Sequence, residues 1–180
     1  NQVFWGAFLA NSTFFTSPRK NFASGATTAF GIDSLTAAEQ LFLDQVDADG
    51  QPLAVSPAVL LVPTALNARA AQLMNSTEIR DTAASTKYPT ANPHAGKFRT
   101  LYSAYLSNAT LTGNSSTAWY LLANPADVPL IEVAFLNGRD VPTVETAEAD
   151  FSVLGVQMRG YFDFGVALQD WRGGVKMAGA

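Results

Sequence analysis

Cysteine is absent from this sequence of 180 residues, and histidine occurs only once, at His94. Without cysteine there is no disulfide framework, cysteine-based zinc site, iron–sulfur cluster or thiol nucleophile. A single histidine also excludes any metal cage built from several imidazoles. We therefore expect no metal, no cofactor and no catalytic residue, and we do not expect an enzyme.

Charged residues are also scarce, at 14% of the chain against a usual share of about 25%, and the net charge is −4. No run of Lys and Arg is longer than Arg19 and Lys20, so the basic stripe of a nucleic-acid-binding protein is missing. Apolar residues make up 48% of the chain, and this predicts a surface that is unusually neutral or covered by other subunits.

No long hydrophobic run is present near the start of the chain either. Residues 3–10 form an apolar stretch that is too short to span a bilayer, and no basic segment precedes it. We therefore expect no membrane association. Because the sequence begins at Asn1 rather than at Met, we expect a fragment or a processed product of a longer protein.

Apolar spacing predicts helices in the first half of the chain. Residues 3–9 suit one face of a short helix, and Ser34 is a good N-cap for a helix over residues 35–46. A short buried strand over residues 59–62 leads into a third helix that ends near Asn75. Residues 76–96 are polar and predict a long surface loop.

The period changes to two after Gly96, which predicts strands in the second half. Residues 98–106 and 131–135 alternate, and residues 118–122 form a continuous apolar run. The clearest alternation predicts one long antiparallel strand whose covered face is lined by Met158, Phe162, Phe164, Val166 and Leu168. Helices in the first half and antiparallel strands in the second predict an α+β fold that forms a single structural unit.

Several motifs fit ordinary structure better than chemistry. Residues 45–50 resemble part of a calcium loop, but the closing bidentate Glu would be Ser56, so we interpret them as a polar turn. His94 lies in a turn-like segment with no nucleophile elbow in the chain. Two pairs of carboxylates could in principle share acid and base roles, Glu132 with Glu145 and Asp163 with Asp170, but we interpret them as strand residues on a solvent face. Four Asn-x-Ser/Thr triplets, at Asn11, Asn75, Asn108 and Asn114, are interpreted as loop residues.

The C-terminal region has the most individual pattern. Asp163, Phe164 and Gly165 match a kinase tripeptide, but the other kinase motifs are absent and the tripeptide lies in a strand pattern. Asp170 and Arg172 lie on one side of an extended strand, where they can form charge-assisted contacts, and Trp171 offers a large apolar anchor. We interpret four residues as candidate subunit-contact or strand-anchoring positions: Asp163, Asp170, Trp171 and Arg172.

In order along the chain, short segments resemble the major head subunit of Mu-like phages and prophages, a member of the tailed-phage major capsid proteins. The resemblance includes Phe14, Phe15, Asn21, residues 34–38, residues 45–53, Pro57, residues 60–63, Asn92, Pro93, residues 118–122, residues 135–138, Pro142, Val144, Glu145, residues 163–165 and residues 170–173. Their order and spacing extend over nearly the whole chain.

This resemblance implies a partial capsid fold of the HK-ninety-seven type. It implies an axial domain over roughly residues 34–150 and peripheral-domain segments over residues 1–33 and 151–180. It also implies the C-terminal part of a longer protein, without the N-terminal arm, the extended loop or most of the spine helix of that fold.

The function implied is that of a structural subunit of an icosahedral phage or prophage capsid. Such a subunit associates with itself into hexamers and pentamers and encloses packaged DNA without sequence-specific binding. Its expected locations are the virion capsid and, before assembly, the bacterial cytoplasm. Two alternatives remain open: an encapsulin-like compartment shell protein, and a secreted carbohydrate-binding or carbohydrate-active β-rich protein.

Overall fold

The computed structural model describes residues 1–10, 12–79, 90–148 and 155–180. Its helices are α1 (Gln2–Ala10), α2 (Ile32–Leu43) and α3 (Asn67–Asn75), with 3-10 turns η1 (Ser17–Arg19), η2 (Ala26–Thr28), η3 (Thr64–Leu66), η4 (Ala104–Ser107), η5 (Leu136–Gly138) and η6 (Trp171–Gly173). Its strands are β1 (Phe22–Ala23), β2 (Pro57–Pro63), β3 (Glu78–Ile79), β4 (Thr90–Ala91), β5 (Arg99–Ser103), β6 (Trp119–Ala123), β7 (Ile131–Phe135), β8 (Thr143–Glu148), β9 (Val156–Tyr161), β10 (Phe164–Leu168) and β11 (Gly174–Met177).

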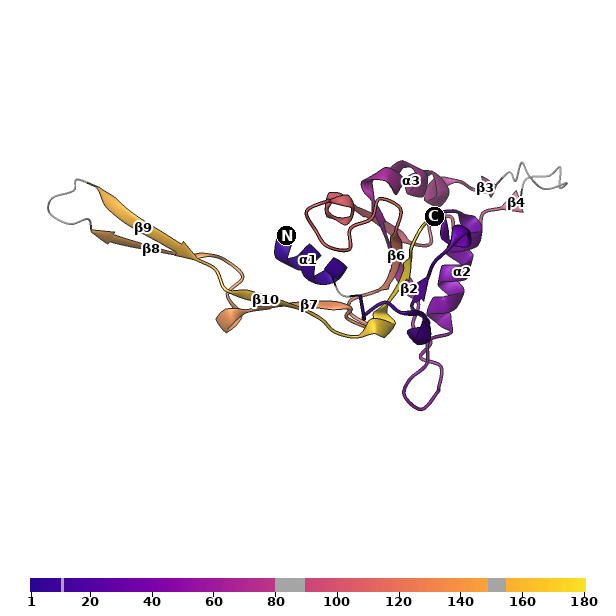
Figure 1. The fold of residues 1–180 in the computed structure, drawn as a ribbon, viewed down its shortest axis with the longest axis horizontal. Helices are drawn as coiled ribbons and strands as arrows, with labels where there is room; N and C mark the ends of the chain where they lie inside the picture. The colour runs from indigo at the N-terminus through magenta and orange to yellow at the C-terminus, as the bar shows by residue number, and fades with distance from the viewer. Residues whose placement is uncertain (11, 80–89, 149–154) are drawn as a thin grey trace.

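The two continuous apolar runs of the sequence form neighbouring central strands of a five-stranded sheet, with strand order β1-β11-β6-β2-β5. A strand that is apolar at every position needs cover on both faces, and the sheet has it. Figure 1 shows the sheet between α1 on one side and α2 on the other. The sheet is mixed, because β1 pairs with β11 and β2 with β5 in parallel, while β6 is antiparallel to both of its neighbours.

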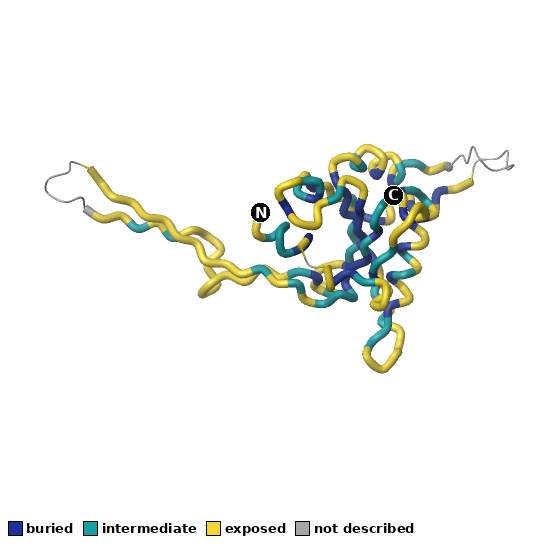
Figure 2. The backbone as a smooth tube through the Cα atoms, viewed as in Figure 1, coloured by how far each residue is buried: buried dark blue, intermediate teal, exposed yellow. Residues whose placement is uncertain are grey.

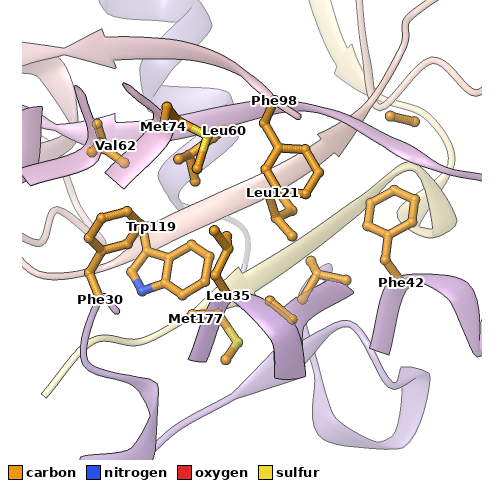
Figure 3. Packing of buried hydrophobic residues seen from close by; sticks show 14 residues of the cluster. Phe30, Leu35, Phe42, Leu60, Val62, Met74, Phe98, Trp119, Leu121 and Met177 are labelled. Atoms are coloured by element: carbon orange, nitrogen blue, oxygen red, sulfur yellow. The ribbon is translucent and has the colours of Figure 1, made fainter. Parts of the chain in front are cut away.

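Alternate residues of the central strands enter two different cores. On one face, Leu60 and Trp119 pack with the apolar faces of α2 and α3. On the other face, Leu61 and Tyr120 pack with Phe8 of α1 and with the aromatic segment that follows this helix. In Figure 3, Trp119 lies beside Phe30, and its indole Nε1 donates a hydrogen bond to the Thr28 carbonyl at 3.0 Å.

A long arm leaves this body between β6 and β11. Its inner half is the antiparallel pair of β7 and β10, and its outer half is the antiparallel pair of β8 and β9. The arm extends far from the sheet in Figure 1, and Figure 2 shows that almost all of its outer half is exposed. A second, much shorter ribbon of β3 and β4 lies at the opposite end of the molecule.

Several sequence-based expectations are confirmed by these elements. The structure contains helices at all three predicted places, and strands at residues 59–62, 118–122 and 131–135. The predicted strand over residues 98–106 ends earlier, because residues 104–107 turn into η4. The predicted loop over residues 76–96 is wrong where β3 and β4 pair, and residues 80–89 lie outside the described residues.

The predicted N-cap and the predicted sheet need correction. Ser34 lies inside the first turn of α2, where its Oγ accepts a hydrogen bond from the Gly31 N–H at 3.0 Å and donates one to the Ala29 carbonyl at 2.7 Å. The cap residue is Gly31. The α+β class is confirmed, but the expected antiparallel sheet is wrong in part, because the predicted strand at residues 59–62 is a central strand of the same sheet and two pairings are parallel.

The C-terminal strand prediction is wrong in two respects. The alternating segment is not one strand, because residues 162–163 separate β9 from β10. Its expected covered face is open over much of its length: Met158 is 71% exposed, and Phe162 and Phe164 are each 37% exposed.

We expect the core and the arm to respond differently to substitution. Trp119→Phe should lower the free energy of unfolding by about 1–3 kcal/mol, because it leaves the Thr28 carbonyl without its donor and leaves a void. The comparison variant, Met158→Ser at an exposed position of the arm, should change the free energy of unfolding by less than about 0.5 kcal/mol. Urea unfolding followed by circular dichroism measures both, and equal losses would contradict this separation of core and arm.

Candidate functional site

The inner half of the arm has one apolar face. Residues that pair directly across two antiparallel strands share a face, and here the pairs are Phe135 with Phe164, Val133 with Val166, and Ile131 with Leu168. At the body end, Ile131 and Leu168 pack against the core formed with α1. Further out, the same face is open, because the side chains of Val133, Phe135 and Phe164 are each 37% exposed.

The two faces of the outer half of the arm differ in polarity. On one face, Val144, Val156 and Met158 are 64%, 67% and 71% exposed. The register places Thr146, Gly160 and Glu148 on the same face, with Glu148 paired with Val156 at its outer end. Apolar side chains this exposed have no cover within the chain. A contiguous exposed apolar surface typically marks a protein interaction site.

The opposite face of the outer half is polar and internally paired. Glu145 and Arg159 are cross-strand neighbours, and the Arg159 Nε donates a hydrogen bond to the Glu145 Oε2 at 2.6 Å. The Tyr161 hydroxyl lies 3.5 Å from the other Glu145 oxygen. These groups satisfy each other in solvent, whereas the apolar side chains of the other face are uncovered within the chain.

An elbow joins the two halves of the arm. One strand passes from β9 to β10 through residues 162–163 alone, while the other needs residues 136–142 to pass from β7 to β8. Asn137 has φ 56° and Gly138 has φ 68°, and these left-handed conformations turn the longer segment. The Leu136 N–H donates to the Asp163 carbonyl at 3.1 Å, which ties the two sides together. Asp163, one of the four predicted contact residues, therefore lies at the elbow.

The other three predicted residues lie together at the base of the arm. They do not form the extended strand that the sequence predicted, because residues 171–173 form the 3-10 turn η6. The Asp170 Oδ1 accepts a hydrogen bond from the Arg172 N–H at 2.9 Å and so caps this turn. β10 separates Asp163 from Asp170 by about 20 Å, at about 3.3 Å per residue, so the structure does not bring Asp163 to this group.

Two guanidinium groups lie near the indole ring of Trp171. The Arg172 guanidinium carbon is 4.6 Å from the centre of the indole ring, and that of Arg19 is 5.6 Å away. The Arg172 Nε also donates to the Val46 carbonyl at 3.1 Å. Its ion pair with Asp170 is long, at 3.5 Å, and both side chains are partly exposed, so this ion pair contributes less than about 1 kcal/mol.

Two buried amides hold this base together; sequence reasoning assigned no structural role to Asn21 and placed Gln45 only at the start of a polar turn. Asn21 is fully buried, and its Nδ2 donates to the carbonyls of Phe14 at 3.0 Å and Trp171 at 3.2 Å. Its Oδ1 accepts from the Thr16 N–H at 2.8 Å. Gln45 donates in the same way to the carbonyls of the segment that contains Arg19. Both residues are in the resemblance described above, which was the only sequence signal for them.

The remaining motifs have structural partners. The Asp47 carboxylate accepts hydrogen bonds from the N–H groups of Asp49 and Gln51, so it closes a polar turn as predicted. Glu132 accepts a hydrogen bond from Gln169 on the arm. Within the described residues, no cluster of three or more His, Asp and Glu side chains has an arrangement that could bind a metal ion. None of the helices described there is long and apolar enough to cross a membrane.

A family model described as phage capsid protein matches residues 1–177, which is nearly the whole chain. No curated protein matches.

We expect the buried amide to matter more than the exposed ion pair at the arm base. Asn21→Ala should lower the free energy of unfolding by about 2–4 kcal/mol, because it removes the partners of two carbonyls and one N–H in a buried place. Arg172→Ala should cost only about 1–2 kcal/mol, since its ion pair is partly exposed. Denaturant melts of both variants test this order, and a larger loss for Arg172→Ala would overturn it.

Proposed function

The chain belongs to the phage capsid protein family, since the family model covers residues 1–177, and we propose that this structural capsid subunit joins its shell through the arm. The observation that supports the proposal is the one-sided exposure of the arm. Its outer half pairs Glu145 with Arg159 on one face and leaves Val144, Val156 and Met158 on the other face open to solvent.

The physical reason is that a two-stranded ribbon is marginally stable by itself in water. The inner half of the arm gains support from α1, but the outer half has no other element packed on its apolar face among the described residues. Burying a large apolar side chain fully contributes about 1.5–3 kcal/mol. A second subunit that covers this face would supply the stabilisation that the chain itself does not provide.

Contact between an arm and a different surface of the next subunit is heterologous, and such contacts repeat around a ring when the rotation closes. We therefore propose that the subunits form closed rings, the hexamers and pentamers of a shell. The scarcity of charge in the chain supports this, because little of the surface needs to remain in water.

We also propose which parts of the capsid fold the body and the arm represent. The sheet with helices on both faces fits the axial domain of an HK-ninety-seven-type subunit, and the arm fits a peripheral segment. A boundary near residue 150 would separate β8 from β9, which pair along their whole length. We therefore propose that residues 131–168 form the peripheral part, in place of the division at residue 150. We also propose that residues 1–33 are axial rather than peripheral, because β1 pairs with β11 in the body sheet.

The candidate contact residues then have two roles. Asp170, Trp171 and Arg172 anchor the end of β10 to the body through the contacts with Asn21 and Val46. Asp163 holds the elbow through its carbonyl. Both roles are structural, and they set the direction in which the arm leaves the body.

The proposed location is the virion, with the bacterial cytoplasm before assembly, and the proposed content of the shell is DNA. A subunit with net charge −4 encloses DNA without binding it tightly, because tight binding requires a surplus of Lys and Arg. The family match does not favour a compartment shell protein or a secreted carbohydrate-binding protein.

We expect the apolar face of the arm to control self-association. The double variant Val144→Ser/Met158→Ser should weaken association more than tenfold, because it removes two large apolar side chains from the contact. The control Ala147→Ser/Gln157→Ala changes the opposite face and should associate normally. Sedimentation velocity and electron microscopy of particles measure association, and circular dichroism checks folding. Equal behaviour of the two double variants would overturn the proposal.

A further inference from the structure

The single histidine of the chain belongs to the segment of residues 92–98 and is buried where this segment meets α2. His94 is 2% exposed and its ring stacks on Phe98, with 5.9 Å between ring centres. The Nε2 atom lies 2.9 Å from the Oγ1 of Thr36 on α2. A buried titratable group between two elements links their contact to the proton concentration.

The hydrogen bonds around Thr36 fix the neutral form of the ring. A hydroxyl has one hydrogen, and Thr36 Oγ1 donates it to the Ile32 carbonyl at 3.0 Å. The same oxygen must therefore accept from His94, so the proton of the neutral ring is on Nε2. The Nδ1 atom carries the lone pair, and it is buried without a hydrogen-bond partner. It lies 3.7 Å from the Glu39 Oε2.

The segment of residues 92–98 contacts α3 on one side and α2 on the other, and the two sets of contacts differ. On the α3 side, the Asn92 Nδ2 donates to the carbonyls of Leu73 at 2.6 Å and Ser76 at 2.8 Å, and the Gly96 N–H donates to the Met74 carbonyl at 2.8 Å. None of these bonds involves a titratable group. On the α2 side, the polar contacts between described residues are the bond from His94 to Thr36, the approach of His94 Nδ1 to Glu39 at 3.7 Å, and the pair of Lys97 with Glu39.

We propose that His94 is an acid-sensitive latch that holds the segment of residues 92–98 against α2 when neutral and releases it when protonated. Neutral imidazole donates its one N–H to Thr36, and its unbonded Nδ1 lone pair brings no net charge into the buried site. Protonation places a full charge in a buried site whose nearest carboxylate is 3.7 Å away and already paired with Lys97. Opening toward α2 hydrates the imidazolium while the α3 side remains bound.

The charges that face His94 oppose each other. Among the described residues, Glu39 on α2 and Lys97 on the segment itself act on the ring. Burial lowers the pKa of His94 below its usual value of 6.5; Glu39 raises it by a smaller amount, and Lys97 lowers it further. A lowered pKa means that the open and unfolded forms bind a proton more readily than the closed form. The contribution to stability is therefore complete above pH 6.5 and is lost as the pH falls below that value.

A single histidine makes the test direct, because NMR of the full chain shows one imidazole titration. We expect a pKa below 6.5, lowered further by Glu39→Gln and raised by Lys97→Met. Opposite shifts of the His94 pKa in these two variants show that the charges of Glu39 and Lys97 act on the ring. A purely structural role of these two side chains would not produce shifts of opposite sign. A pKa at or above 6.5 in the unaltered chain would overturn the proposal.

Hydrogen exchange tests the release itself. After correction for intrinsic exchange, the N–H groups of Ala95 and Lys97 should lose protection as the pH falls from 7 to 5, by up to tenfold per pH unit because one proton is bound. His94→Gln keeps an amide that can bond to Thr36 and does not titrate, so its protection should not change with pH. Protection independent of pH in the unaltered chain, or an unchanged pH dependence in His94→Gln, would contradict the latch.

Discussion

The antiparallel pairing of β6 with β11 is the constraint on which the arm depends. The chain leaves the sheet after β6 and returns to it at β11, and Leu122 and Gly174 are direct neighbours in that pair. Both strands of the arm therefore start from one place and stay close enough to pair. Gly174 permits this junction, because an added Cβ would lie 2.7 Å from Leu130 and 3.2 Å from Leu122. The amide of Asn21 then fixes the returning chain at Trp171.

Body and arm differ in how their apolar residues are covered. The central strands of the body are buried on both faces by helices and aromatic segments of the same chain. The arm uses the same residue types but has cover only at its base, so its apolar face is available to another subunit. This difference is consistent with a chain that is 48% apolar and only 14% charged, since part of its apolar surface is uncovered within one molecule.

The sequence predicted the elements whose pattern is local. The helices and central strands followed from apolar spacing, and the polar turn at Asp47 followed from its residue types. The break between β9 and β10 could not be predicted, because alternation continues through residues 162–163 without interruption. Nor could the exposure of Met158, since periodicity shows which residues share a face and not whether anything covers it. The role of Asn21 depends on a contact across 150 residues of sequence, and no local pattern contains it.

The elbow has a further consequence for how the length of the chain can vary. The inner and outer halves of the arm are separate hydrogen-bonded ladders, each with its own register. Residues 136–142 belong to neither ladder, and their left-handed turn at Asn137 and Gly138 already directs the chain away from both. Additional residues inserted there change no pairing and invert no face. The elbow is therefore the place where the chain can accept a foreign peptide while both ladders keep their register.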